Sequence, residues 1–226
     1  MDRLLPREIC EQEWAVEIAA MKPSICHFEM FLGFEGDIER LGATRSNHWF
    51  FESWDTNDGL WMNTESPIQM MFVSFPSLKD AKHDPGPSHR HTGQFMVLAD
   101  WSTVADFVTD DGIEDPDKWA AFKDDVEARM LTFFANKFPA LAPLVVCRVF
   151  GTPLTTAKFT AHEKGGFYGL EMTPRRIMSD ALRPRTPVPG LYLTGQDVLT
   201  PGIAGSLFSG MLTAAAIDPR VYTKMR

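Results

Sequence analysis

The chain has 226 residues, a net charge of −8 and 44% hydrophobic residues, which is enough apolar material for a folded core. Its acidity excludes an extended phosphate-binding surface, because nucleic-acid binding requires clustered Lys and Arg. The three cysteines are scattered without the spacing of metal ligands. We therefore expect neither a disulfide framework nor a metal site, and a reducing compartment suits the chain best.

Membrane insertion has no support in the hydropathy pattern. No uninterrupted apolar run approaches the roughly 20 residues that cross a bilayer, and the first residues lack the basic-then-apolar order of a signal peptide. We expect a soluble chain, cytoplasmic or held peripherally on an internal membrane. Its 17 Phe, 6 Trp and 12 Met suit an ordinary core or an apolar cavity, and both interpretations stay open.

The first half of the chain reads as a helix followed by strands. Apolar residues at helical spacing predict a helix at residues 8–21. A loop rich in Pro, Gly and charge is predicted at 79–90. Segments rich in apolar and β-branched residues predict strands of one sheet at 24–34, 48–51, 69–75 and 94–98.

The second half contains the clearest helix. It opens at Asp115-Pro116, carries apolar residues three and four apart, and stops at Phe138-Pro139. A strand follows at 144–150, and the stretch from there to Pro189 reads as irregular. The remaining predictions are a strand at 191–194, a turn at 195–201 and a helix at 202–217.

The last of these segments has parts that suit ligand binding. Asp197, at a strand end, can accept hydrogen bonds from a sugar or ribityl hydroxyl, and the free amides of residues 202–205 can meet an electron-rich ligand edge. Small residues in this helix let its backbone approach a flat ligand. Such a helix also packs tightly on a sheet for purely structural reasons, so the residues alone leave both interpretations open.

Whole segments of the chain resemble a known family. The string GLYLTGQDVLTPGIAGSLFSG at 190–210 resembles the C-terminal flavin motif of the phytoene desaturase superfamily, and it is most similar to the retinol saturase and carotenoid isomerase type. The string GTPLTTAKFTAHEKGGFYGLEMTPRR at 151–176 resembles another segment of that family. Weaker similarity runs through SNHWFFESWD and MFVSFPSLKD, so the resemblance covers most of the chain.

The resemblance implies FAD as the cofactor. Asp197 would lie near its ribityl or phosphate oxygens, and Tyr168 and Gly169 would lie close to the flavin face. Neither the residues nor the resemblance identifies a catalytic acid or base. The residues implied to lie along the cofactor are Gly195, Gln196, Asp197, Thr200, Gly202, Ile203, Ala204 and Gly205.

The resemblance also implies an α+β fold in two parts. Residues 1–165 would form a substrate domain with a mixed sheet covered by helices, and residues 166–226 would supply the terminal strand and helix of a Rossmann-type FAD-binding domain. The sheet and the helix at 119–138 would wall an apolar tunnel for a polyene. Leu207, Phe208 and Leu212 should be exposed where the rest of the FAD-binding domain is absent.

One expected motif is missing. Members of the family begin with a strand, a GxGxxG turn and a helix that bind the pyrophosphate, and this sequence contains no GxGxxG. We therefore expect a C-terminal fragment, a shortened form, or a subunit completed by another chain.

By resemblance, the expected function is that of a flavin-dependent oxidoreductase. Its substrate would be a conjugated isoprenoid polyene, retinol or a carotenoid, which it saturates or isomerises, with a reductant such as a nicotinamide nucleotide and possible contact with a membrane surface. The alternative is a non-catalytic remnant that binds a lipophile, or a subunit that needs a separate nucleotide-binding chain.

Other candidate sites favour ordinary structural explanations. His83, His89 and His91 lie within nine residues, but nothing near them completes a metal-ligand pattern. An acidic run from Asp106 to Asp117 suits a helix start better than a calcium loop. Lys158 and Lys164 read as surface lysines rather than partners of a reduced flavin or a phosphate. No GxSxG elbow supports a hydrolase.

Overall fold

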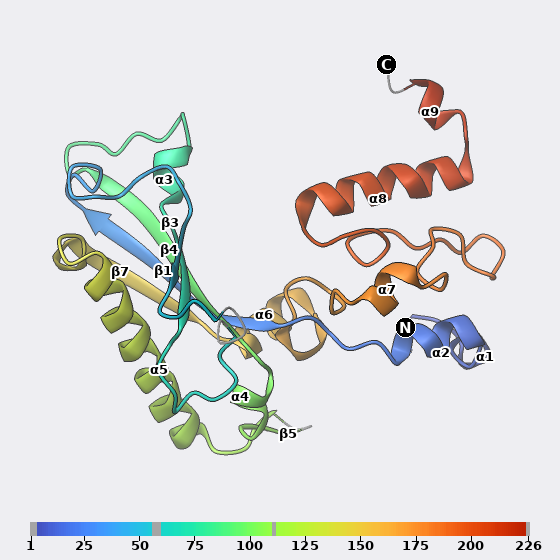
Figure 1. Cartoon of the computed structure of the whole chain (residues 1–226), viewed down its shortest axis with the longest axis horizontal. Coiled ribbons are helices and arrows are strands. Elements are labelled where there is room, and N and C mark those ends of the chain that lie inside the picture. The colour runs from blue at the N-terminus through green and yellow to red at the C-terminus, as the bar shows by residue number, and fades with distance from the viewer. Residues whose placement is uncertain (1–3, 56–59, 110–111, 225–226) are drawn as a thin grey trace. The chain divides into compact units, whose positions relative to one another are not determined.

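The computed structural model describes residues 4–55, 60–109 and 112–224 (Figure 1). Its contacts divide the chain into two compact units: the sheet unit, Ile25–Gly165, and the C-terminal unit, Met1–Ser24 with Gly166–Arg226. One unit boundary lies between Gly165 and Gly166, and another between Ser24 and Ile25. The division into a substrate domain and a cofactor domain stays a prediction.

The sheet unit is built on a five-stranded sheet in the order β2-β3-β4-β1-β7. Figure 1 labels β1, β3, β4 and β7. Every pair of neighbouring strands in it is antiparallel, so the expectation of a mixed sheet is wrong. The strands are β1 (Cys26–Glu35), β2 (His48–Phe51), β3 (Met70–Ser74), β4 (Arg90–Ala99) and β7 (Val145–Gly151).

Smaller elements complete the sheet unit. A short two-stranded pairing joins β5 (Val108–Thr109) to β6 (Gly112–Ile113). The helices are α3 (Pro76–Lys79), α4 (Ser102–Ala105), α5 (Pro116–Lys137) and α6 (Pro153–Thr160), with 3-10 turns η2 (Ala142–Leu144) and η3 (Glu163–Gly165). The prediction of irregular structure after residue 150 therefore missed α6, whose start is fixed by a capping box of Thr152 and Thr155.

Helix α5 covers one face of the sheet, and the core lies between them (Figure 1). The helix begins where the sequence predicted, and Asp115 caps its first turn by accepting hydrogen bonds from the amides of Asp117 and Lys118. Phe134 of α5 stacks on Phe95 of β4 at 5.1 Å. The largest fully buried side chains are Phe28, Phe34, Phe75, Phe95 and Phe134. Because these rings fill the space between helix and sheet, the expected tunnel between the two does not form there.

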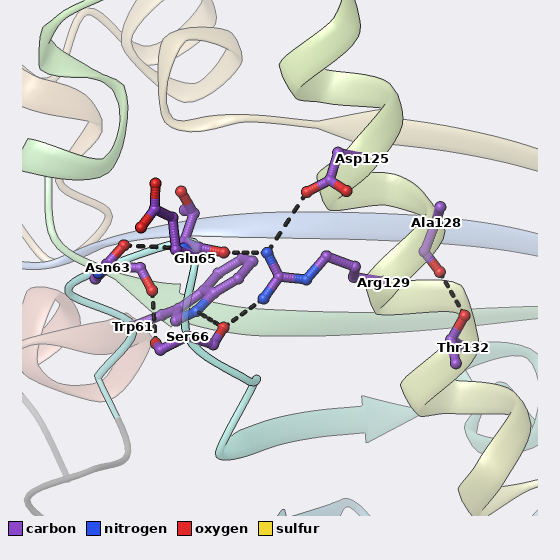
Figure 2. Close-up of polar contacts among 9 residues, drawn as sticks. Trp61, Asn63, Glu65, Ser66, Asp125, Ala128, Arg129 and Thr132 are labelled. Atoms are coloured by element: carbon purple, nitrogen blue, oxygen red, sulfur yellow. Dashed lines mark hydrogen bonds and ion pairs between the residues drawn. The ribbon is translucent and has the colours of Figure 1, made fainter.

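Arg129 ties α5 to the loop before β3 (Figure 2). Its guanidinium donates hydrogen bonds to the carbonyl oxygens of Thr64 and Ser66 and lies 4.9 Å from the centre of the Trp61 ring. Asp125, one turn earlier on the helix, lies 3.5 Å from the same nitrogen that binds Thr64. The two nitrogens of the planar guanidinium thus hold the loop at two carbonyl oxygens, which the single ammonium group of Lys would do less well.

The C-terminal unit has helices but no multistranded sheet among the described residues. It contains α1 (Arg7–Cys10), α2 (Glu13–Ala19), α7 (Pro174–Met178), α8 (Gly202–Ile217) and α9 (Val221–Lys224). The single helix predicted at 8–21 is split, because Gln12 has an extended backbone between α1 and α2. Helix α8 has the bounds predicted from the sequence.

The strand predicted at 191–194 is not formed. Tyr192 makes only an isolated bridge with Arg185, and the Leu193 amide donates to the Pro184 carbonyl at 2.9 Å. A strand needs a continuous ladder, and no strand of this unit lies beside the segment among the described residues. The predicted exposure of the α8 side chains is confirmed: Leu207 is 65% exposed and Phe208 53%. None of the helices described has the length and apolar character required to span a bilayer.

Cys26 offers a test of the sheet core. Its thiol is buried and donates to the Ala99 carbonyl at 3.1 Å, and burial, reinforced by the charge of Asp100, raises its pKa from 9.0 to about 12. The unfolded thiol loses its proton first as the pH rises, so the free energy of unfolding should fall between pH 9 and 12. Urea unfolding at stepped pH should show a steeper fall for the wild type than for Cys26→Ala. Equal slopes would contradict the assignment.

Candidate functional site

The C-terminal unit contains an open hollow at the start of α8. It has a volume of about 720 Å³ and is called the α8 hollow below. Its lining combines two aromatic rings, polar side chains and exposed glycine backbone. The lining residues are Phe167, Tyr168, Thr194, Gly195, Gln196, Asp197, Gly202, Ile203 and Ser206.

Two glycines shape the rim of the α8 hollow. Gly195 has φ +98° and Gly202 has φ +89°, backbone angles that residues other than glycine rarely adopt. A Cβ atom built on either glycine would meet no heavy atom within 4 Å, so both positions face open space. The backbone between them can therefore approach a bound molecule closely.

The inner side of α8 holds the preceding segment in place. The Gly195 amide donates to Ser209 Oγ at 2.9 Å, and the Thr213 hydroxyl donates to the Leu193 carbonyl at 2.8 Å. A Cβ atom on Gly205 would lie 1.8 Å from the Thr200 carbonyl oxygen. Gly205 is thus required for the turn to fold back onto its own helix.

The first turn of α8 is open to a ligand. Pro201 precedes the helix, no side chain caps it, and the first turn carries no acidic residue. Its leading amides consequently lack intrahelical acceptors, and the positive end of the helix dipole lies at the edge of the hollow. Ile203 in this turn is 91% exposed.

Asp197 is held by one of its two carboxylate oxygens. Oδ1 accepts a hydrogen bond from the Leu170 amide at 2.8 Å and lies 3.5 Å from Nη2 of Arg176. Oδ2 has no hydrogen-bond partner among the described residues. The arrangement leaves one acceptor oxygen available to a hydroxyl or amide donor, and it disfavours a phosphate, which a carboxylate repels.

The guanidinium of Arg176 is buried, with 3% of the residue exposed. It donates to the carbonyl oxygen of Leu170 and, at 2.6 Å, to that of Gln196. Burial lowers the pKa of Arg176, and the charge of Asp197 opposes this shift. Arginine stays protonated in proteins, so the pair is ionic.

Tyr168 reaches the hollow from a tightly bound turn. Its amide donates to Ser24 Oγ at 3.0 Å, and the Ser24 amide donates to the Gly169 carbonyl at 2.7 Å. Gly169 has φ +69°, and a Cβ atom there would lie 2.3 Å from Asp197 Oδ1. Phe167 and Tyr168 have ring centres 4.0 Å apart, which gives the hollow a wall of aromatic surface.

The structure brings most of the expected cofactor residues together. Gly195, Gln196, Asp197, Gly202 and Ile203 line the hollow with Tyr168, and Gly169 lies against the Asp197 carboxylate. Three expected residues lie outside the lining: Thr200, Ala204 and Gly205.

Sequence reasoning missed Phe167 and Thr194. It counted Ser206 only among the small residues of the helix, and it included Arg176 only as the last residue of the family-like string at 151–176. An arginine three residues after Thr173 is a weak signal, because only the fold shows that Arg176 is the buried residue of this short helix.

A second candidate surface lies on the sheet unit, on the face that α5 leaves uncovered. Residues paired across an antiparallel ladder point to the same side, so Phe31 shares this outer face with Gln94 and Val149. Trp49 pairs with Phe72 in the same way, and their rings lie 4.9 Å apart. About half of Trp49 and of Phe31 is exposed. The outer face therefore presents aromatic surface that the core does not use.

The histidine cluster lacks the geometry of a metal site among the described residues. His83 and His91 have rings 5.4 Å apart, but within the described residues no group of three His, Cys, Asp or Glu side chains could hold a metal ion. His83 Nε2 lies 2.8 Å from the Arg90 carbonyl. Burial, together with the neighbouring His83, lowers the pKa of His91.

The last part of the acidic run lies at the start of α5, where Asp115 is the N-cap residue. Hydrogen bonds from the backbone amide of Lys118, assisted by its ammonium group, lower the pKa of Asp115. Asp110 and Asp111 lie outside the described residues. The hollows of about 350 and 500 Å³ that border Arg129 contain a guanidinium that is already hydrogen-bonded to two carbonyl oxygens.

Substitution of two α8 glycines should distinguish a tightly packed position from one with free space around it. Gly205→Ala places a methyl group against the Thr200 backbone, so we expect the free energy of unfolding to fall by about 2–3 kcal/mol. Gly210→Ala in the same helix meets nothing within 4 Å and should raise it by about 0.5–1 kcal/mol. Urea unfolding followed by circular dichroism measures both. A loss for Gly210→Ala equal to that for Gly205→Ala would refute the packing argument.

Comparison with known proteins finds similarity to proteins named as retinol reductases and prolycopene isomerases. No protein-family model matches it. It is 25% identical over 214 residues to all-trans-retinol 13,14-reductase of Rattus norvegicus, covering 90% of this chain and 35% of that protein. It is 28% identical over 158 residues to the chloroplastic prolycopene isomerase of Arabidopsis thaliana, covering 68% and 25%.

A third relative is named as inactive. The chain is 26% identical over 219 residues to the inactive all-trans-retinol 13,14-reductase of Danio rerio, covering 90% of this chain and 35% of that protein. The chain thus spans about a third of the length of the curated retinol reductases it matches. The similarity extends across both units, and it supports a resemblance to the retinol saturase and carotenoid isomerase type.

Proposed function

We propose that this chain forms part of an FAD-dependent oxidoreductase that acts on a conjugated isoprenoid polyene. The observation that carries the proposal is the α8 hollow, in which Gly195, Asp197, Gly202 and Tyr168 from separate segments surround one open space. The relatives support the substrate class, since their names specify retinol and prolycopene. The chain would contribute the substrate sheet and the terminal helix of a Rossmann-type FAD-binding domain.

The residues of the hollow fit a flavin. Gly195 and Gly202 leave backbone open to a ligand at positions where a side chain would stand. The free Oδ2 of Asp197 would accept a hydrogen bond from a ribityl hydroxyl, and the first amides of α8 would face an electron-rich edge of the ring. Bound FAD would supply hydride transfer to or from the polyene, after reduction by a donor such as a nicotinamide nucleotide.

The outer face of the sheet would bind the polyene. Phe31, Trp49 and Val149 expose apolar surface on it, and a conjugated chain is flat and apolar, so burial of both surfaces favours contact. A lipophilic substrate also favours a location at or near a membrane surface. The three cysteines are all free, in keeping with a reducing compartment.

A non-catalytic lipophile-binding role is the second candidate. It is favoured by the relative named as inactive. In that case the outer face would still bind a polyene, but no flavin would be retained without a nucleotide-binding chain.

Flavin binding is tested by the visible spectrum of the purified chain after incubation with FAD and desalting. We expect flavin absorbance to be retained and Asp197→Ala to raise the dissociation constant at least about tenfold, because the hollow then loses its free acceptor. Asp180→Ala is the control, since Asp180 is exposed in the same unit and lies outside the hollow. No binding at saturating FAD, or unchanged binding by Asp197→Ala, would count against the proposed flavin site.

Polyene binding is tested separately, by titration with all-trans-retinol and detection of its fluorescence. Phe31→Ala removes an exposed ring from the outer face, and we expect roughly tenfold weaker binding, equivalent to about 1.4 kcal/mol. Phe159→Ala removes a ring from α6 that is more exposed, 79% against 44% for Phe31, and should leave the affinity unchanged. Equal effects of the two substitutions would show that the sheet face is not the binding surface.

A further inference from the structure

We propose that Arg176 is a positioning residue of the α8 hollow, which orients the Asp197 carboxylate and holds the Tyr168 turn so that Oδ2 faces the ligand. The inference rests on the proposed function only for the identity of that ligand, a flavin. Arg176 itself does not line the hollow. Its effect would therefore pass through the groups that it binds.

The guanidinium joins two segments that are far apart in the sequence. Nη1 donates to the Leu170 carbonyl, and Nη2 donates to the Gln196 carbonyl at 2.6 Å while lying 3.5 Å from Asp197 Oδ1. One planar cation thus contacts both the turn that carries Tyr168 and the segment that carries Asp197. Lysine has a single nitrogen and cannot reproduce this divided set of contacts.

Asp197 completes the connection from the other side. Its Oδ1 accepts from the Leu170 amide at 2.8 Å, so the carbonyl of Leu170 is bound by the cation and its amide by the anion. With Oδ1 occupied by two partners, Oδ2 is the oxygen left for a ligand. The orientation of the carboxylate is therefore set by contacts behind the hollow.

The local structure holds Arg176 in this place. The Arg176 amide donates to Thr173 Oγ1 at 3.2 Å, which caps α7 at its start. Gly169 leaves room for the carboxylate, because a side chain there would overlap Asp197. Arg175, the preceding residue of α7, is exposed and makes none of these contacts. The sequence thus offers a neighbouring arginine as a matched control.

The first test needs no ligand. Hydrogen exchange measured on peptides that cover residues 166–171 reports the Leu170 amide that binds Asp197. We expect Arg176→Gln to speed this exchange by about tenfold or more, Arg176→Lys to do so partly, and Arg175→Gln to leave it unchanged. Unchanged protection in Arg176→Gln would overturn the proposal. If Arg176→Gln fails to fold, Arg176→Lys and Asp197→Asn provide the same comparison.

The second test asks whether Arg176 acts through Asp197. Riboflavin is the probe, because it carries the ring and the ribityl hydroxyls without phosphate, and its affinity is measured by fluorescence quenching. We expect Arg176→Gln and Asp197→Asn each to weaken binding about tenfold, and the double variant to be no weaker than either one. Fully additive losses would overturn the positioning role.

The two tests distinguish this inference from the proposed function. If the exchange result is as expected but the wild-type chain binds neither riboflavin nor FAD, Arg176 positions the turn and the flavin site is refuted. If riboflavin binds and Asp197→Asn weakens it while Arg176→Gln does not, the flavin site stands and the positioning role of Arg176 is refuted.

Discussion

The candidate site depends on one buried guanidinium. The C-terminal unit has no multistranded sheet among its described residues to hold its loops, and Arg176 contacts the Leu170 carbonyl, the Gln196 carbonyl and the Asp197 carboxylate. Burial of this guanidinium is costly, because its charge loses hydration, whereas the Asp197 side chain stays 39% exposed. Removal of the carboxylate would leave the buried charge unpaired. Such a pair contributes little net stability, but it fixes the geometry of the loops around it.

The sheet unit is held together by a hydrophobic core rather than by a buried charge. Strand β1 lies between β4 and β7, and its inward side chains pack with α5 in a core of phenylalanine and methionine. Because alternate residues of a strand point to opposite faces, the residues between the core positions of β1 and β7, such as Phe31 and Val149, lie on the outer face. The aromatic side chains of that outer face cannot be assigned to the core, and this leaves them available to an apolar ligand.

The sequence predicted what depends on local patterns. Helix α5 and the bounds of α8 follow from apolar spacing, Pro116 and Pro201, and the five strands of the sheet lie close to the predicted segments. What the sequence could not give were pairings between distant residues. Nothing local indicates that all the strands of the sheet would pair antiparallel, or that residues 191–194 would have no neighbouring strand in the part of the chain that the structure describes. For the site, the motif located Asp197 and Tyr168, whereas the inward turn of Arg176 depends on contacts 20 residues away.

The glycines of the flavin-like motif show why the two interpretations of such a segment are not exclusive. A small residue can serve a ligand or can serve packing, and the sequence alone does not separate these uses. In this fold they separate by position. Gly195 and Gly202 face open space, while Gly169 and Gly205 lie against Asp197 and Thr200. The packing glycines bring the carboxylate and the turn close enough to shape the hollow, and the open glycines then leave it accessible. The open hollow therefore depends on the tight packing at Gly169 and Gly205.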